Sequence, residues 1–123
     1  GLKISAWEID VANGRETERI VRAEGGEITF IEVDLSQASA IDHAIAQTRA
    51  AYGAPYAIVN NASMFPRAPA ADMPRSVFET TLAVNVTAPF HISQAFAPDM
   101  IAAGRGIIIN IASGRAVQGA VMV

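Results

Sequence analysis

Four short apolar runs alternate along the chain with longer segments in which apolar residues recur every three or four positions. The runs are rich in β-branched residues, which predicts strands over residues 3–7, 28–33, 56–59 and 107–112. The longer segments predict helices over residues 15–24, 37–52 and 74–103. Strands and helices therefore alternate through the whole chain.

Local signals set the expected limits of the first two helices. Asn13-Gly14 predicts a turn ahead of the first helix, whose inner face should carry Ile20 and Val21. Ser36 is expected to cap the start of the second helix, and Gly53 to end it. The inner face of the second helix is predicted from the spacing of Ile41, Ile45, Thr48 and Tyr52.

The third helix carries two unusual features. Pro89 and Pro98 predict bends or breaks, because proline has no N–H to donate. Asn85 lies between Val84 and Val86, although Asn is a poor helix former. A bound water, a distorted helix or an ordinary buried hydrogen bond would each explain Asn85.

The alternating order predicts an α/β fold with a doubly wound, mostly parallel sheet. Wholly apolar strands are typical of a sheet covered by helices on both faces. In such sheets ligands bind beyond the carboxyl ends of the strands. The residues at those ends are Glu8, Asp34, Asn60 with Asn61, and Ser113.

Composition narrows the functional classes. The chain has 123 residues, 51% of them hydrophobic and 17% charged, which suits one packed domain. A net charge of −3 without a basic stripe argues against nucleic acid, and no apolar stretch is long enough to cross a membrane. No signal peptide is recognisable, so a cytoplasmic protein is expected. The absence of Cys and the wide separation of His43 and His91 argue against a metal site.

The acidic residues at the strand ends have two interpretations each. Glu8 could accept both hydroxyls of an adenosine ribose, which would favour NAD over NADP, or it could be a solvated turn residue. Asp34 could accept a hydrogen bond from an adenine amino group, or it could simply shape the turn before a helix.

The polar uncharged residues are harder to explain as turn residues. Asn60 and Asn61 are adjacent amides after a buried strand and need several hydrogen bonds, whereas a turn needs only one Asn. Ser113 has no G-x-S-x-G context and no neighbouring His or Asp, so it is not read as a nucleophile. Its hydroxyl could still polarise a substrate carbonyl.

Several of these segments resemble motifs of the classical short-chain dehydrogenases/reductases. "VNNAS" (59–63) resembles the family's N-N-A-G motif, "LAVNVTAPF" (82–90) its central-helix motif, and "INIAS" (109–113) the strand end that carries a catalytic Ser. "KISAWEID" (3–10) and "EVDLS" (32–36) resemble the segments that contact the adenosine half of the cofactor. The motifs follow the family's order over essentially the whole chain.

The resemblance implies a Rossmann-like domain that transfers hydride between a nicotinamide and a carbonyl or secondary alcohol. It implies catalytic roles for Ser113, as a hydrogen-bond donor to the substrate, and for Asn85, as the holder of a relay water. The implied cofactor residues are Glu8, Asp34, Leu35, Asn60, Asn61 and Ala62. The implied substrate mouth is formed by Met64, Phe65 and Arg67, and the implied assembly is a homodimer or homotetramer.

The sequence also departs from the family pattern. Ser63 replaces a usual Gly, and neither the glycine-rich phosphate loop nor the Tyr-x-x-x-Lys pair is present. Residues 1–123 are therefore expected to form a partial domain, from the family's second strand to its fifth, that is inactive alone. The strand between the first and third strands seen here would be missing, which would leave an apolar slot.

Two other interpretations remain open from the sequence. A signalling receiver domain would also be a small doubly wound sheet, but it needs an Asp where Asn60 stands and an essential Lys that is missing. A non-catalytic fragment that self-associates through the apolar segment 90–103 would bind no nucleotide.

Overall fold

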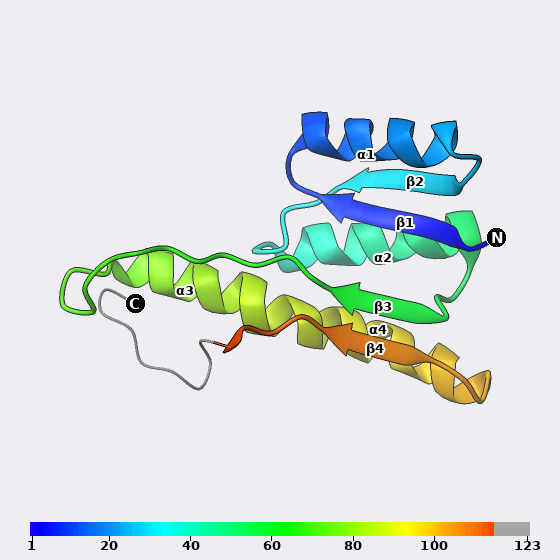
Figure 1. Cartoon of the computed structure of the whole chain (residues 1–123). Helices are drawn as coiled ribbons and strands as arrows, with labels where there is room; N and C mark the ends of the chain where they lie inside the picture. Colours follow the sequence, from blue (N-terminus) through cyan, green and yellow to red (C-terminus); the bar gives the residue numbers. More distant parts are fainter. Residues whose placement is uncertain (115–123) are drawn as a thin grey trace.

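The computed structural model describes residues 1–114, and in it strands alternate with helical regions (Figure 1). The first half comprises β1 (Lys3–Glu8), α1 (Val11–Ala23), β2 (Glu27–Glu32) and α2 (Ala38–Tyr52). The second half comprises β3 (Ala57–Asn60), α3 (Arg75–Leu82), a π-helical turn η1 (Ala83–Thr87), α4 (Ala88–Ala102) and β4 (Ile107–Asn110). The predicted alternating order is confirmed.

The strands form two parallel pairs rather than one continuous sheet. β1 pairs with β2, with Lys3 opposite Glu27, and β3 pairs with β4, with Asn60 opposite Asn110. Within residues 1–114, β1 and β3 are not joined by ladder hydrogen bonds. All four strands point in the same direction (Figure 1), so the predicted parallel arrangement is confirmed although the sheet is divided.

Helices α2 and α4 hold the two pairs together. One buried cluster joins residues of α2, β3 and α4, namely Ile41, Ile45, Ile58, Ala88, Ile92, Phe96 and Met100. Trp7 of β1 packs against this cluster and against a second one formed by Ile31, Val33 and Ala44. At the surface between the helices, Arg49 is paired with Asp99 at 2.7 Å, and His91 with Asp42 at 2.9 Å.

Helix α1 begins earlier than predicted. Asp10 caps it by accepting a 3.0 Å hydrogen bond from the backbone N–H of Asn13, so Asn13-Gly14 lies in the helix and forms no separate turn. Gly14 is required by packing instead, because an added Cβ would lie 2.1 Å from Cε2 of Phe30. The glycine therefore marks a close approach of α1 to β2 rather than a turn.

The inner face of α1 also differs from the prediction. Of the two predicted residues, Ile20 is 44% exposed and Val21 is half-buried, while Gly14 and Glu18 are buried. A carboxylate can lie there because its oxygens receive hydrogen bonds from three partners, which a hydrophobic-periodicity argument does not consider.

The second helix follows its prediction except at its start. Ile41, Ile45 and Thr48 are buried, and Gly53 ends the helix with φ of 76°. Ser36 does not cap it, because α2 begins at Ala38 and the N–H of Ser36 is instead bound by the carboxylate of Asp34.

The third helical region is interrupted at η1, next to Pro89, and continues as α4 through Pro98. Pro89 lies in the first turn of α4 and Pro98 within it, while the N–H of Ala88 donates to the carbonyl of Ala83, five residues earlier. Pro89 cannot donate to the carbonyl of Asn85, as an α-helix would require. Loss of that donor favours the wider turn at this point.

Helical cover differs between the two strand pairs. Helix α1 lies on one face of β1–β2 and α2 on the other, as predicted. Helix α4 packs on the face of β3–β4 that carries Ile58. The opposite face exposes Val59, Ile107, Ile109 and Ile111, and Ile108, which is opposite Ile58, is also 40% exposed. Within residues 1–114, helices therefore cover both faces of β1–β2 but only part of β3–β4.

No helix in the described part of the chain has the length and hydropathy needed to cross a membrane.

Candidate functional site

The strand arrangement brings the predicted residues to one edge of the molecule. Parallel strands end at the same side, and Figure 1 shows that β1, β2, β3 and β4 all do so. Glu8 is the last residue of β1, Asp34 follows β2, Asn60 ends β3 and Ser113 follows β4. Open α/β sheets bind their ligands at this edge.

The Glu8 carboxylate is held by its own loop. Its Oε1 accepts hydrogen bonds from the backbone N–H groups of Ile9 at 2.8 Å and Asp10 at 3.0 Å. Its backbone carbonyl accepts from Val33 at 3.1 Å, which ties the loop to the end of β2. Both side-chain bonds use Oε1, so Oε2 remains as an acceptor for an outside donor.

Asp34 has a similar arrangement one strand away. Its Oδ1 accepts from the N–H of Ser36 at 2.9 Å, and its carbonyl accepts from Gln37 at 3.0 Å. The neighbouring Leu35 packs against both buried clusters. Leu35 can therefore contribute backbone atoms to a site, while its side chain stabilises the core.

Asn60 makes a contact that the sequence analysis missed. Its Nδ2 donates to Oδ1 of Asn110 at 2.8 Å, directly across the β3–β4 pair. The N–H of Ile111 donates to the carbonyl of Asn60 at 3.0 Å, so pairing continues one residue beyond β4. The sequence did contain a signal for Asn110, because it is an amide at the end of an apolar strand. It lies in the same "INIAS" segment as Ser113.

The side chain of Asn85 holds the loop after β3 through two hydrogen bonds. Its Oδ1 accepts from the N–H of Met64 and its Nδ2 donates to the carbonyl of Met64, both at 2.8 Å. Further along this loop, the guanidinium of Arg67 lies over the ring of Phe65, 5.7 Å from its centre. Asn61, Ala62 and Phe65 are exposed, and Met64 is partly buried.

These contacts form a chain of connections along the edge. Asn85 fixes Met64, the loop leads back to Asn60, and Asn60 is bonded to Asn110, three residues before the exposed Ser113. The structure therefore brings η1, the β3 loop and the end of β4 together. No group of three or more His, Cys, Asp or Glu residues within residues 1–114 could hold a metal ion.

Comparison with known proteins defines the family. The family model for short chain dehydrogenase matches residues 1–123, and the chain belongs to this family. An uncharacterized oxidoreductase of Thermotoga maritima is 35% identical over 118 residues, which are 96% of this chain and 46% of the relative.

Solved structures agree with this assignment. A metagenomic short-chain oxidoreductase in complex with NADP superposes with a TM-score of 0.92 at 36% identity, over 98% of this chain and 55% of that one. An NAD⁺-bound xylitol dehydrogenase superposes with a TM-score of 0.89 at 28% identity, over 99% of this chain and 47% of that one. The chain thus has the Rossmann-like fold of the family and spans about half the length of these relatives.

Proposed function

We propose that the protein containing this chain is an NAD-dependent oxidoreductase that interconverts a secondary alcohol and a carbonyl compound. The observation that carries the proposal is the convergence of Glu8, Asp34, Asn60 and Ser113 at the carboxyl edge of the parallel strands. Residues 1–123 would then be the part of a longer dinucleotide-binding domain that runs from its second strand to its fifth. A separate preceding strand would fit between β1 and β3, which are not paired with each other.

The adenosine half of the cofactor would bind along Glu8 and Asp34. Oε2 of Glu8 can accept from a ribose hydroxyl, and its charge would repel a 2′-phosphate. Asp34 keeps Oδ2 as an acceptor for an adenine amino group, since its side-chain bond to Ser36 uses Oδ1. Asn60, Asn61 and Ala62 would line the second ribose. The nicotinamide, when bound, supplies the hydride acceptor or donor.

Ser113 would donate a hydrogen bond to the substrate oxygen, which stabilises charge as it develops there. Asn85 would hold the relay water through its backbone carbonyl, because its side chain is already bonded to Met64 and Pro89 cannot satisfy that carbonyl. Met64, Phe65 and Arg67 would form the substrate mouth. The similarity to a xylitol dehydrogenase supports a small polyol or the corresponding sugar as substrate.

Nucleotide titration of the full-length protein tests this function. NADH should bind more tightly than NADPH, and Glu8→Ala should reduce that preference by at least about tenfold, as expected for loss of one charge–charge discrimination. Glu24→Ala is the matched control, because Glu24 follows α1 at its other end and should leave the preference unchanged. Equal binding of both nucleotides by the unmodified protein would contradict the role of Glu8.

A separate substitution tests the catalytic assignment. Ser113→Ala should lower kcat by about 10²-fold or more without weakening NADH binding, since the hydroxyl is proposed to contact the substrate and not the cofactor. Unchanged kcat would remove Ser113 from the mechanism.

A second candidate function is self-association without catalysis. Phe78, Leu82, Val86 and Phe90 are exposed at four-residue intervals along α3, η1 and α4. An apolar stripe of this kind is typical of a helix that packs against another protein surface. In this case sedimentation analysis should show that the 123-residue chain forms homodimers or homotetramers, and the chain should bind neither NADH nor NADPH. Phe90→Glu should then convert these oligomers to monomers.

A further inference from the structure

The outer edge of β2 carries backbone groups that do not face β1. The N–H of Val33 donates to the carbonyl of Glu8, so the alternation along a strand turns residues 29 and 31 toward β1. Residues 28, 30 and 32 therefore direct their N–H and carbonyl groups outward. Such an edge is a template on which a strand of another chain can pair.

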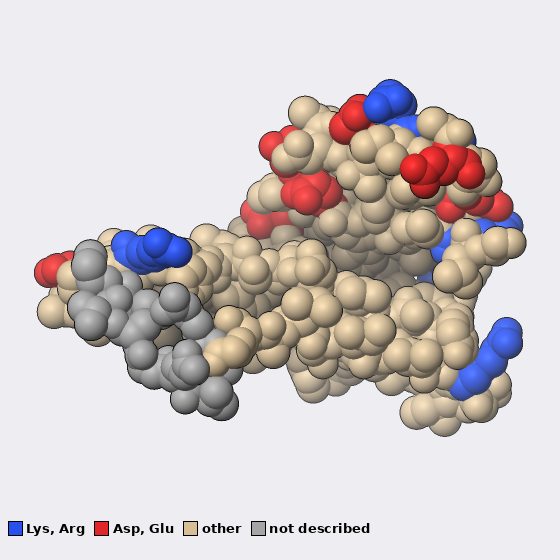
Figure 2. All heavy atoms as spheres, viewed as in Figure 1, with Lys and Arg blue, Asp and Glu red and all other residues tan. Residues whose placement is uncertain are grey.

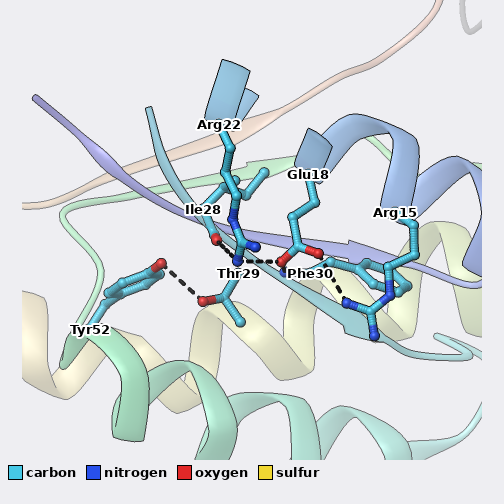
Figure 3. Close-up of polar contacts among 7 residues, drawn as sticks. All are labelled: Arg15, Glu18, Arg22, Ile28, Thr29, Phe30 and Tyr52. Atoms are coloured by element: carbon cyan, nitrogen blue, oxygen red, sulfur yellow. Dashed lines mark hydrogen bonds and ion pairs between the residues drawn. The ribbon is translucent and has the colours of Figure 1, made fainter. Parts of the chain in front are cut away.

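Two side chains of α1 bind two of these backbone groups (Figure 3). Nη2 of Arg22 donates to the carbonyl of Ile28 at 3.1 Å, and the N–H of Phe30 donates to Oε1 of Glu18 at 3.3 Å. The same Nη2 of Arg22 donates to the same Oε1 of Glu18 at 2.8 Å. Two of the outward backbone groups, the carbonyl of Ile28 and the N–H of Phe30, are thus bridged by one ion pair.

The pattern matches what a neighbouring strand would do. One residue of an added parallel strand would donate its N–H to the carbonyl of residue 28 and accept from the N–H of residue 30. The donor of Arg22 and the acceptor of Glu18 make these same two bonds. We propose that Glu18 and Arg22 act together as a substitute for a neighbouring strand and close the outer edge of β2 to strand addition.

The surroundings of Glu18 support this role. Glu18 is only 8% exposed although it is charged, and its Oε2 accepts a hydrogen bond from Nη1 of Arg15 at 3.0 Å. Arg15 also lies over the ring of Phe30, 5.2 Å from its centre. The hydrogen bond from Arg15 lowers the pKa of Glu18, with smaller contributions from the N–H of Phe30 and the charge of Arg22, and these outweigh the opposing effect of burial. The acceptor therefore stays ionised at neutral pH.

The occupant that this edge excludes is an extended apolar strand, above all β2 of a second copy of the chain. β2 combines Ile28, Phe30 and Ile31 with β-branched Thr29, a composition that favours edge-to-edge pairing. The inference does not depend on the enzymatic function, because it concerns a sheet edge away from Ser113 and Asn85.

Amide hydrogen exchange measured by NMR tests the contact itself. Glu18→Ala should speed exchange at Phe30 by about tenfold or more, while the amides of Thr29 and Ile31, which face β1, change little. Glu16→Ala is the matched control, because Glu16 is on the same helix but pairs with Arg19 at 2.7 Å in solvent. Unchanged exchange at Phe30 in Glu18→Ala would overturn the proposal.

Disulfide cross-linking tests whether the edge then pairs. The chain has no Cys, so Glu32→Cys at the exposed end of β2 introduces a single thiol. Oxidation should cross-link little of the otherwise unmodified chain and several-fold more when Glu18→Ala or Arg22→Met is added. Gln47→Cys on the exposed side of α2 should show no such increase.

Arg22→Met covers the case in which Glu18→Ala fails to fold, because it keeps the aliphatic stem and removes the guanidinium that donates to Ile28 and to Glu18. Glu32→Cys alone should cross-link less than Glu32→Cys combined with Glu18→Ala or Arg22→Met. Equal cross-linking would show that the edge is already open and would contradict the proposal.

Discussion

The two strand pairs have similar strands but very different surroundings. The β1–β2 pair is covered on both faces, and the outer edge of β2 is bridged by Glu18 and Arg22. Helix α4 packs on one face of the β3–β4 pair, and the other face exposes apolar side chains, with Val59 58% and Ile109 43% exposed. In Figure 2 the charged side chains gather over the first pair, whereas the surface over the second is mostly uncharged.

This difference shows that an apolar strand sequence does not by itself ensure that helices bury both faces of the strand. Parallel strands are apolar because they are normally buried between two helical layers. The segment 107–109 consists of three Ile residues, which would suit such burial, yet each of them is at least 40% exposed within residues 1–114. The first unit, β1–β2, is covered on both faces by α1 and α2, whereas the second unit, β3–β4, retains an apolar surface suited to another element.

The largest expected effect concerns the junction between the units. Phe96 is 2% exposed in the cluster that joins α2, α4 and β3, so Phe96→Ala should lower the free energy of unfolding by about 3–5 kcal/mol. Urea unfolding followed by Trp7 fluorescence measures this, because Trp7 packs against the same cluster. Phe90→Ala, on the same helix but 63% exposed, should cost less than about 0.5 kcal/mol. Equal losses would mean that this cluster does not hold the units together.

A matched pair of substitutions compares the units directly. Ile31→Thr buries a hydroxyl in the covered unit and should cost about 2 kcal/mol. Ile109→Thr makes the same change on the open face, should alter stability by less than about 0.5 kcal/mol, and should reduce self-association. Denaturation and sedimentation velocity measure the two effects. A large loss of stability in Ile109→Thr would show that the open face is buried in solution.

Close packing in the first unit can be tested at Gly14. The added Cβ of Gly14→Ala would collide with the buried ring of Phe30, so we expect a net loss of about 1–2 kcal/mol despite the better helix propensity of Ala. Combining it with Phe30→Leu removes the ring, and the two losses should then be less than additive in thermal unfolding. Full additivity would exclude this contact as the cause.

The smallest effect is a pH dependence confined to the closed edge. The lowered pKa of Glu18 means that its contribution is complete above the ordinary Glu range and is lost as the pH falls through the lowered value. Exchange at Phe30, corrected for the intrinsic rate, should therefore be constant above about pH 5 and rise below about pH 4. The pKa of Glu16 is also lowered, by Arg19, but Glu16 binds no strand amide. An increase at pH 6 would point to a different group.

Much of the site could be predicted because its residues follow strand ends. Glu8, Asp34, Asn60 and Ser113 are recognisable where an apolar run stops, and parallel strands must end at one edge. Asn110 was missed because its significance comes from lying opposite Asn60, fifty positions away, and only pairing reveals register. The roles of these residues in binding and catalysis stay predictions.

The sequence by itself determined the order of elements, the family and the inner face of α2, because hydrophobic period and motif spacing are local properties. Only the tertiary structure decided that Gly14 serves packing, that Glu18 is buried and that Asn60 is bonded to Asn110. Each of these depends on which atoms approach from distant parts of the chain. A buried carboxylate or a bare glycine is stable only when those atoms satisfy its charge or fill its space, and no local pattern records them.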